Sequence, residues 1–354
     1  MKLFFTVLLL SALIFQSGTG CKKDDLNYIS FPELLTDSIP FENNDIKIEF
    51  VADLPFAGNA SITGLHFFDA LQGIAITNAG EIYKTTDGGI NWLRKYASAG
   101  SIPLHQVLFT NNTTGYVVGG NISCSGTGCI SPGGVIIKTT DEGNTWNEIF
   151  NESATDFVSI AVNSRNELFA VGNGAKNQIF KSINNGNNWA PITVSDQNFY
   201  KIIFNDGFGF CTSTSGGKLL SSTDDGLTWN LDSAFATLIT TDIKFNDGIG
   251  FCIGGPGVYK TTDNGHTWRE TIAGIGPYVI NPLTKNSCIA FGAGEYTSGD
   301  FGHFYASIWQ SKNGGNSWTN TQFKNTSGII CADFYTTVNG YAPAGDKLLK
   351  ITVK

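Results

Sequence analysis

The sequence predicts an all-β protein, a seven-bladed β-propeller of four-stranded antiparallel blades in which the chain's two ends share the last blade. Two observations favour this fold. A ten-residue motif ending in Trp recurs six times, and the composition combines 42 glycines and 12% aromatic residues with a single methionine. Glycine-rich turns and aromatic strands are typical of β proteins, whereas helical proteins use more Ala, Leu, Glu and Met.

Residues 1–20 are predicted to be a signal peptide. Lys2 precedes an apolar run of about 13 residues, which is too short to span a bilayer comfortably. Small residues then lead to Cys21, and this end of the segment resembles the lipobox of bacterial lipoproteins, in which such a cysteine becomes the acylated first residue. The resemblance implies a lipid anchor at Cys21 that attaches the mature protein to a membrane.

Residues 21–45 are expected to be the lipidated cysteine and a polar tether. Its charged run Lys22–Asp25 is read as solvated linker, or alternatively as a surface-export signal of the kind some gram-negative lipoproteins carry. Lys22 stands where an inner-membrane retention signal would have Asp. We therefore expect a cell-envelope lipoprotein of the outer membrane, facing either the periplasm or the surface.

The recurring motif is first seen as YKTTDGGINW at residues 83–92, and its tryptophans lie roughly 40 to 55 residues apart, a spacing typical of propeller blades. In each copy a strand is expected to turn at Asp-x-Gly and to leave as a second strand from the Trp onward. The recurring positions are Asp87, Gly89, Trp92; Asp141, Gly143, Trp146; Asn184, Gly186, Trp189; Asp224, Gly226, Trp229; Asp263, Gly265, Trp268; and Asn313, Gly315, Trp318.

Two further strands are expected upstream of each motif, as in DIKFND at 242–247 followed by GIGFCIGG at 248–255. Each blade then has strands A to D, counted outward from the propeller axis. After the sixth motif, residues 328–354 supply only three strands. The early segment IKIEFVADL at 46–54 has no partners of its own, so it is expected to close the ring as the fourth, and the propeller should span 46–354.

The motif resembles the Asp-box, or bacterial neuraminidase repeat. The predicted propeller is similar to the photosystem II stability/assembly-factor group and, more distantly, to the ten-bladed domain of sortilin. This resemblance covers nearly all of residues 46–354. It implies the fold and no single function, because Asp-boxes occur in sialidases, xyloglucan hydrolases, receptors and assembly factors alike.

The motif residues are expected to be structural. Asp accepts backbone hydrogen bonds in the turn, Gly supplies a positive φ, and Trp packs between blades. Asn184 and Asn313 replace the Asp in two copies, which preserves the acceptor oxygen but removes the carboxylate. His266 has no equivalent in the other copies. Asp263 and His266 are therefore not predicted to form a catalytic pair.

Strand alternation places the motif turns on one face of the propeller and the B–C loops and A-strand starts on the other, where a ligand site is expected. Two B–C loops are long: residues 121–134, in which Cys124 and Cys129 are predicted to form a disulfide rather than free thiols, and residues 294–307. The A-strand starts also include Lys244. The candidate ligand-binding residues are His105, Gln106, Tyr200, Lys201, Asp242, Glu295, Tyr296, Asp300 and His303.

The net charge of −8, without a run of Lys or Arg, disfavours nucleic-acid binding. A sialidase needs three arginines at its pocket, and Arg94, Arg165 and Arg269 fall on outer strands or an A–B turn. The sequence thus predicts a binding module for a protein or glycan partner, with no catalytic residue, metal or cofactor. The alternative is a carbohydrate hydrolase that uses acids such as Asp242, Glu295 or Asp300. The remaining cysteines, Cys211, Cys252, Cys288 and Cys331, are expected to be buried free thiols.

Overall fold

The computed structural model describes residues 34–36 and 41–354, apart from 57–59, 122, 126–127, 131–132, 175–176, 193, 195–197, 214–218, 233–239, 255–256, 273–276, 297–302 and 324–327. The chain divides into two units, Met1–Phe31 and Pro32–Lys354. The first unit, with the predicted signal peptide and Cys21, lies outside the described residues. All of the described residues belong to the second unit.

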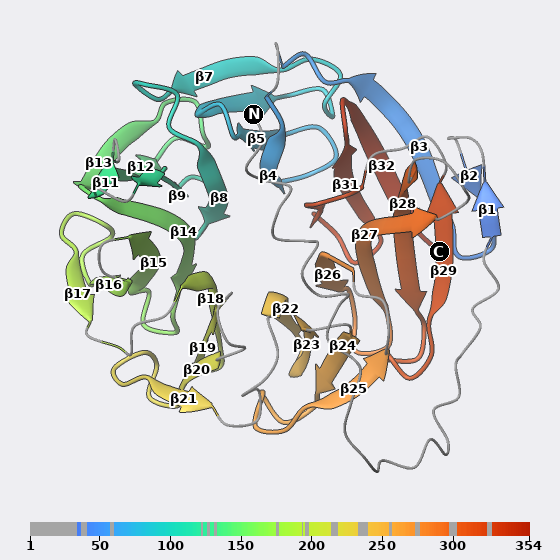
Figure 1. Cartoon of the computed structure of the whole chain (residues 1–354). Coiled ribbons are helices and arrows are strands. Elements are labelled where there is room, and N and C mark those ends of the chain that lie inside the picture. Colours follow the sequence, from blue (N-terminus) through green and yellow to red (C-terminus); the bar gives the residue numbers. More distant parts are fainter. Residues whose placement is uncertain are drawn as a thin grey trace. The chain divides into compact units, whose positions relative to one another are not determined.

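Seven antiparallel sheets are arranged in a ring, and the blades follow one another in chain order (Figure 1). Five blades have four strands, A to D, in chain order, and in the second of them the hairpin of β10 (Ser123–Ser125) and β11 (Gly128–Ile130) comes between the B and C strands. These are β4 (Ile62–Phe67), β5 (Gly73–Thr77), β6 (Glu81–Thr85), β7 (Leu93–Ala97); β8 (Leu104–Phe109), β9 (Gly115–Gly119), β12 (Gly134–Thr139), β13 (Asn147–Glu152); β14 (Thr155–Val162), β15 (Leu168–Gly174), β16 (Gln178–Ser182), β17 (Ala190–Ile192); β18 (Phe199–Asn205), β19 (Phe208–Ser213), β20 (Leu219–Ser222), β21 (Asn230–Asp232); and β22 (Thr240–Asn246), β23 (Ile249–Gly254), β24 (Gly257–Thr261), β25 (Arg269–Ile272).

The last two blades use strands from the N-terminal part of the described chain. Blade 6 consists of β26 (Val279–Pro282), β27 (Cys288–Tyr296), β28 (His303–Ser311) and β29 (Thr319–Phe323), with β1 (Leu34–Thr36) added in parallel to β29. Blade 7 consists of β30 (Asp333–Phe334), β31 (Asn339–Ala344), β32 (Lys347–Val353) and β3 (Ile46–Asp53), with β2 (Phe41–Glu42) paired to β3.

The ring closes as predicted. β3 pairs antiparallel with β32 from Ile46 opposite Val353 to Asp53 opposite Lys347. Alternate residues of β3, such as Ile48, are buried against the core of blades 6 and 7. The seven-bladed prediction with a shared last blade is confirmed. The prediction of a tether over residues 21–45 is wrong in part. Strands β1 and β2 fall in this segment, and they hydrogen-bond to blades 6 and 7.

The core lies between neighbouring blades. Neighbouring blades cover both faces of the inner strands of a blade. Every residue of the B strands β5 and β9 is therefore buried, instead of every second residue. The motif tryptophan contributes to this packing, since Trp146 of blade 2 belongs to one buried cluster with Ile74 of blade 1. Gly143 has a φ of 77°, and a Cβ there would lie 2.6 Å from Ile74 Cδ1. Both backbone conformation and blade contact therefore require glycine.

The motif turns form one repeated hydrogen-bond network. In blade 5, Thr261 Oγ1 donates to Asp263 Oδ1 (2.7 Å) and accepts from Gly265 N (2.9 Å). Thr267 donates its N–H (2.9 Å) and its hydroxyl (2.6 Å) to the same carboxylate. Trp268 Nε1 donates to Gly265 O (2.9 Å). The acceptor capacity of Asp263 is thus used inside the turn.

The two copies of the motif with Asn in place of Asp keep the hydrogen bond from the backbone N–H four positions further on. Asn184 Oδ1 accepts from Asn188 N and Asn313 Oδ1 from Ser317 N, both at 2.9 Å. His266 takes part in the turn through its backbone, since its N–H donates to Asp263 O (3.3 Å), while its ring meets Phe208 edge-on at 4.9 Å. These turns stabilise the outer hairpins and leave no free carboxylate for chemistry.

Candidate functional site

Residues on or just before the A strands of all seven blades line a cavity of about 490 Å³ at the face opposite the motif turns. It is called here the distal cavity. Its lining begins at the A-strand starts and reaches deeper along β4 and β8. The polar side chains in this lining are Thr63, His66, His105, Gln106, Ser159, Tyr200, Lys201, Asp242, Lys244, Tyr278 and Asp333.

Three large apolar side chains stand exposed around the distal cavity, one at the A-strand start of each of blades 4, 6 and 7. Tyr200 is 45% exposed, Tyr278 39% and Ile330 54%, and all three line the cavity. Exposed apolar residues scattered singly need no explanation, but these three line one cavity. The distal cavity therefore has an apolar rim above a polar floor.

Asp242 lies in this floor and is fully engaged. Its side chain accepts hydrogen bonds from Lys201 Nζ, from Ile243 N (3.0 Å) and from Ile280 N (2.9 Å). The residue is only 4% exposed. Burial alone would raise the pKa of Asp242, but the charges of Lys201 and Lys244 outweigh it and lower the pKa. Asp242 is an ionised clamp that joins blades 4, 5 and 6.

His105 and Gln106 join blade 2 to blade 3. His105 Nε2 lies 2.9 Å from Asp156 Oδ1 and 3.2 Å from Gly120 O. Burial lowers the pKa of His105, but the hydrogen bond and charge of Asp156 outweigh it and raise the pKa above its ordinary value. Gln106 donates to Ile160 O (3.0 Å) and accepts from Ile160 N (3.1 Å).

Sequence reasoning thus brought together five residues that line one cavity: His105, Gln106, Tyr200, Lys201 and Asp242. Lys244 was named as an A-strand residue but was not among the predicted ligand-binding residues. The prediction also left out His66, Tyr278, Ile330 and Asp333. All occur on or just before A strands. They could have been found by applying to every blade the rule that A-strand residues face the channel.

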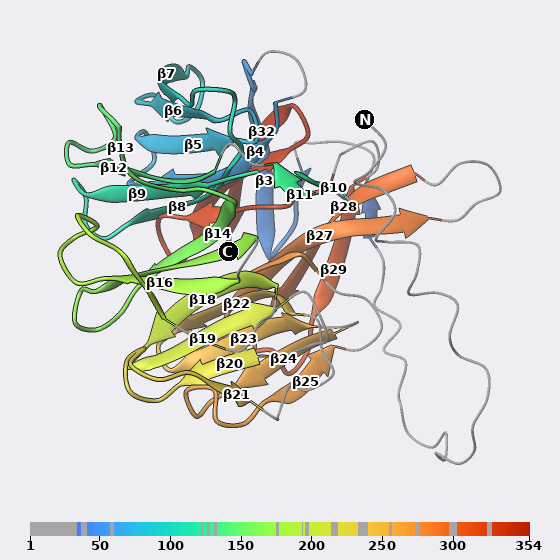
Figure 2. The ribbon, with the colours of Figure 1, turned by 60° about the vertical axis from the view of Figure 1, so that its left-hand side comes forward.

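The expected loop at residues 294–307 differs from the structure. There β27 and β28 continue as a hairpin, with Glu295 opposite Phe304 and Tyr296 opposite His303, and this hairpin extends beyond the other blades (Figure 2). Aromatic residues favour strands, which accounts for the longer ladder. The side chains of Glu295, Tyr296 and His303, and all of Asp300, lie outside the described part, so their role as candidate ligand-binding residues stays a prediction.

The first long B–C segment also contains a hairpin, β10 (Ser123–Ser125) with β11 (Gly128–Ile130). Cys124 and Cys129 are directly opposite each other in its antiparallel register. Opposite residues in such a pair have Cα atoms about 4.5 to 5.5 Å apart, a separation a disulfide can bridge. The side chains of both cysteines lie outside the described residues, and the disulfide stays a prediction.

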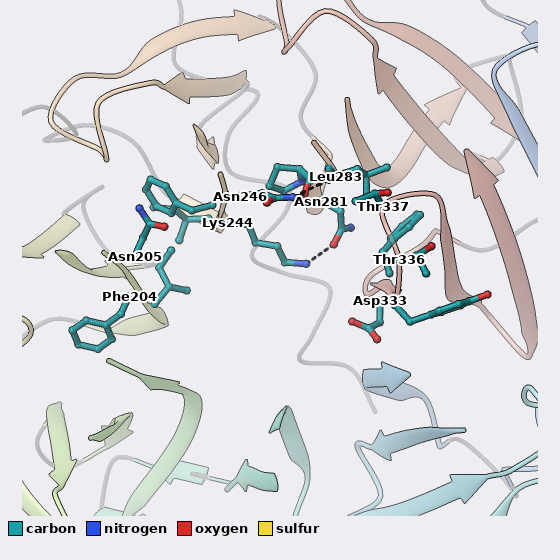
Figure 3. Close-up of a pocket in the computed structure, with 15 residues that line it drawn as sticks. Phe204, Asn205, Lys244, Asn246, Asn281, Leu283, Asp333, Thr336 and Thr337 are labelled. Atoms are coloured by element: carbon teal, nitrogen blue, oxygen red, sulfur yellow. Dashed lines mark hydrogen bonds between the residues drawn. The ribbon is translucent and has the colours of Figure 1, made fainter. Parts of the chain in front are cut away.

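A second cavity, of about 550 Å³, opens on the face of the motif turns and is called here the Asp-box cavity, after the repeat that these turns resemble. It is lined by the ends of the A strands of blades 4 to 7, including Asn205, Asn246, Asn281 and Asp333 (Figure 3). Lys244 Nζ donates to Asn281 Oδ1 at 2.6 Å in its wall. Lys244 and Asp333 line both cavities. The sequence analysis expected a ligand site only on the other face.

Within the described residues, no group of three or more His, Cys, Asp or Glu side chains is arranged to hold a metal ion. Nor does that part of the chain contain a helix long and apolar enough to cross a membrane.

No family model matches the chain. It is 26% identical over 162 residues to the photosystem II assembly lipoprotein Ycf48 of Prochlorococcus marinus strain MIT 9313, a match that covers 44% of each chain. The Ycf48 of strain MIT 9312 is 27% identical over 172 residues, or 48% of each chain. The match therefore spans about half the length of these curated relatives.

Two solved structures have the same fold. YCF48 bound to a D1 peptide superposes with a TM-score of 0.64 at 17% identity, covering 90% of this chain and all of that one. The GH74 xyloglucanase of Xanthomonas campestris gives a TM-score of 0.64 at 13% identity, over 86% of this chain and 53% of that one.

Proposed function

We propose that this protein is an envelope-anchored propeller scaffold of the assembly-factor kind, which holds a segment of a partner protein in the distal cavity. The observation that carries the proposal is the apolar rim formed by Tyr200, Tyr278 and Ile330. Aromatic and aliphatic side chains at the centre of a polar surround are the usual anchors of protein interfaces. Burying the exposed half of each one contributes roughly 1 kcal/mol.

The floor of the distal cavity suits a peptide backbone. Lys201, which donates one hydrogen bond to Asp242, keeps further N–H donors, and the hydroxyl group of Tyr200 belongs to the rim itself, so a partner's polar main chain can be satisfied while its side chains cover the rim. The similarity to Ycf48, one of whose structures holds a D1 peptide, supports a protein partner over a glycan. The partner of this chain is proposed by class only.

The location is also part of the proposal. Residues 1–20 would direct export, and acylation of Cys21 would attach the propeller to the outer membrane, in the periplasm or at the surface. The curated relatives are lipoproteins by name, which agrees with this placement. The photosystem partner of those relatives is not carried over.

A glycan hydrolase is the weaker candidate. The shared fold with a GH74 xyloglucanase is its support. A general acid needs a carboxyl group that can exchange a proton with substrate, whereas the described hydrogen bonds of the Asp242 carboxylate come from Lys201 and two backbone N–H groups.

The experiment uses peptide display against the protein that lacks residues 1–21, followed by calorimetry on a selected peptide. Tyr200→Ala together with Tyr278→Ala should weaken binding at least tenfold, because both anchors are lost. Leu227→Ala removes an equally exposed apolar side chain from a motif turn and should leave affinity unchanged.

Equal affinity of the rim variant and the Leu227→Ala control would refute the proposal. A hydrolysis screen on a glycan panel is the second arm. Turnover that disappears in Asp242→Ala or Glu295→Ala would establish the hydrolase instead.

A further inference from the structure

Lys244 is an unusual residue for its place in the fold. In the register of blade 5 it lies opposite Phe251, as Ile203 lies opposite Phe210 in blade 4. A neighbouring blade thus fills the same A-strand position with an apolar side chain. An ammonium group here loses hydration, and hydrogen-bond acceptors or a negative charge must offset that cost. An apolar side chain at this position needs no such partner.

The protein supplies only part of that partner. Among the described residues, the one hydrogen bond of Lys244 Nζ is to Asn281 Oδ1, and no carboxylate lies within ion-pair distance. An ammonium group has three N–H donors, so two remain for a ligand. Figure 3 shows the Lys244 side chain extending into the Asp-box cavity toward Asn281.

Asn281 provides a second, independent sign of a missing acceptor. The residue is 7% exposed and lines the cavity, and its Nδ2 has no hydrogen-bond partner within the described part of the chain. Buried amide donors are nearly always satisfied in proteins. Lys244 therefore places unpaired donors at one wall of the cavity, and the unpaired Asn281 Nδ2 lies beside it, buried behind the cavity surface.

The opposite wall limits what acceptor fits. Asp333 lines the same cavity, and Figure 3 shows its carboxyl group on the side facing Lys244. Its Oδ2 accepts from Phe67 N at 2.6 Å, while no bond of its Oδ1 is described. A phosphate dianion would be repelled by this carboxyl group. A monoanion that also has a hydroxyl or ammonium group can satisfy both walls.

Other charged groups act on Lys244. Asp242 on the same strand and Asp333 on β30 raise the pKa of Lys244, but burial is the largest influence and, with Lys201, lowers that pKa overall. A bound anion would oppose this shift by favouring the charged ammonium.

We propose that the Asp-box cavity binds the carboxylate of a small ligand that also has a hydroxyl or amino group, with Lys244 as the carboxylate-binding residue and Asn281, whose Oδ1 accepts from Lys244 Nζ, as the residue that positions it. A free acid such as a uronic sugar and the C-terminus of a short peptide share this chemistry. The site is separate from the rim of the distal cavity and does not rest on the protein-binding proposal.

The test follows the side-chain ammonium signal of Lys244 by NMR in the protein lacking residues 1–21. The probes are two matched pairs: glucuronate with glucose, and the dipeptide Ala-Ala with its C-terminal amide. The carboxylate member of at least one pair should shift the signal saturably, and its neutral counterpart should not. The pair that responds identifies the source of the carboxylate.

Variants assign the effect to these residues. Asn281→Ala should weaken binding of the responding probe at least tenfold, and Lys244→Met should abolish binding as measured by calorimetry. Lys312→Met, which removes a half-exposed surface lysine paired with Asp45, is the matched control and should bind normally. Circular dichroism checks that each variant is folded. If Lys244→Met does not fold, the titration of the wild-type protein with the matched probes still tests the proposal.

Absence of a saturable shift with both carboxylates would overturn the proposal, as would equal binding of a carboxylate and its neutral counterpart. The outcome is distinguishable from that of the partner-protein experiment, because the Tyr200 and Tyr278 variants leave the Asp-box cavity intact and should keep carboxylate binding.

Discussion

Asp242 and Lys244 lie two residues apart on β22, yet the structure gives them different tasks. Asp242 is surrounded by donors from three blades and acts as a structural clamp. Lys244 reaches the meeting point of the two cavities with a single described hydrogen bond. Residue type alone would have suggested the opposite, since a carboxylate on a cavity wall is the more usual candidate for chemistry.

The motif carboxylates show the same principle of local satisfaction. The hydroxyl of Thr267 is the largest influence on Asp263 and, with the other turn donors, lowers its pKa to about 2. The pKa of Asp141 is lowered to about 2 in the same way by Thr145. Asn184 and Asn313 retain an acceptor without the charge.

We predict that Asp263→Asn changes the free energy of unfolding at pH 7 by less than about 1 kcal/mol, whereas Asp263→Ala costs about 1 kcal/mol or more, because only the second removes the acceptor. Urea denaturation measures both. A large loss in Asp263→Asn would mean that the charge itself is required.

The sign of the pH dependence follows from the lowered pKa. The carboxylate's contribution is complete above the unfolded pKa near 4 and is lost as the pH falls through about 2. Asp263→Asn should therefore lose less stability than the wild type between pH 5 and pH 3. Identical curves for the two proteins would contradict this assignment.

At the scale of elements, closure of the ring depends on β3. Its residues Ile46 and Ile48 are buried among side chains that include Leu349 and Ile351 of β32. Without β3, the edge of β32 would be open to solvent and to pairing with other chains. β1 and β2 add hydrogen bonds to the outermost strands but close nothing.

We predict that removing residues 1–54 abolishes cooperative folding, while removing residues 1–40 does not. Loss of two buried isoleucines alone costs about 4 to 10 kcal/mol, comparable to the whole stability of a typical domain. Thermal denaturation and size-exclusion chromatography distinguish the two truncations. A peptide of residues 41–54 added to the shorter protein should restore the melting transition, and a cooperative transition without it would show that closure is dispensable.

In the whole propeller, every blade packs against two neighbours. Side chains buried between blades therefore become accessible to solvent only when the ring opens. Cys211, Cys252 and Cys288 are such groups, on the B strands of blades 4, 5 and 6, and burial raises the pKa of each of Cys211 and Cys288 well above its ordinary value. Cys331 is free but only partly buried, which differs from the prediction of a buried thiol, and desolvation raises its pKa to about 12. Little reactive thiolate is available in the folded ring.

We predict that the buried thiols of Cys211, Cys252 and Cys288 react with a chromogenic disulfide reagent only as fast as the protein unfolds, since burial suppresses both thiolate formation and access of the reagent. Parallel stopped-flow fluorescence supplies the unfolding rate. In denaturant, prior reduction should expose two additional thiols if Cys124 and Cys129 are bonded. Fast reaction of a buried thiol under native conditions would show that single blades open independently.

The sequence by itself determined the number of blades, the shared last blade and the structural part of the motif turns. These follow from short-range patterns: the hydroxyl–Asp–Gly–Trp spacing builds a turn from residues four positions apart, and repetition supplies the comparison that separated Asp263 from catalysis. The five A-strand residues that line the distal cavity were also predictable, because the chain direction in each blade decides which face an A strand starts on.

The tertiary structure alone decided which side chains meet across the channel. Lys244 and Asn281 come from neighbouring blades, and Asp333 lies about 90 residues from Lys244 on a strand whose position depends on ring closure. Strand twist and ring radius set these distances, and neither leaves a local pattern. The same holds for Tyr200, Tyr278 and Ile330, which line one cavity only because strand starts from different blades converge on one axis.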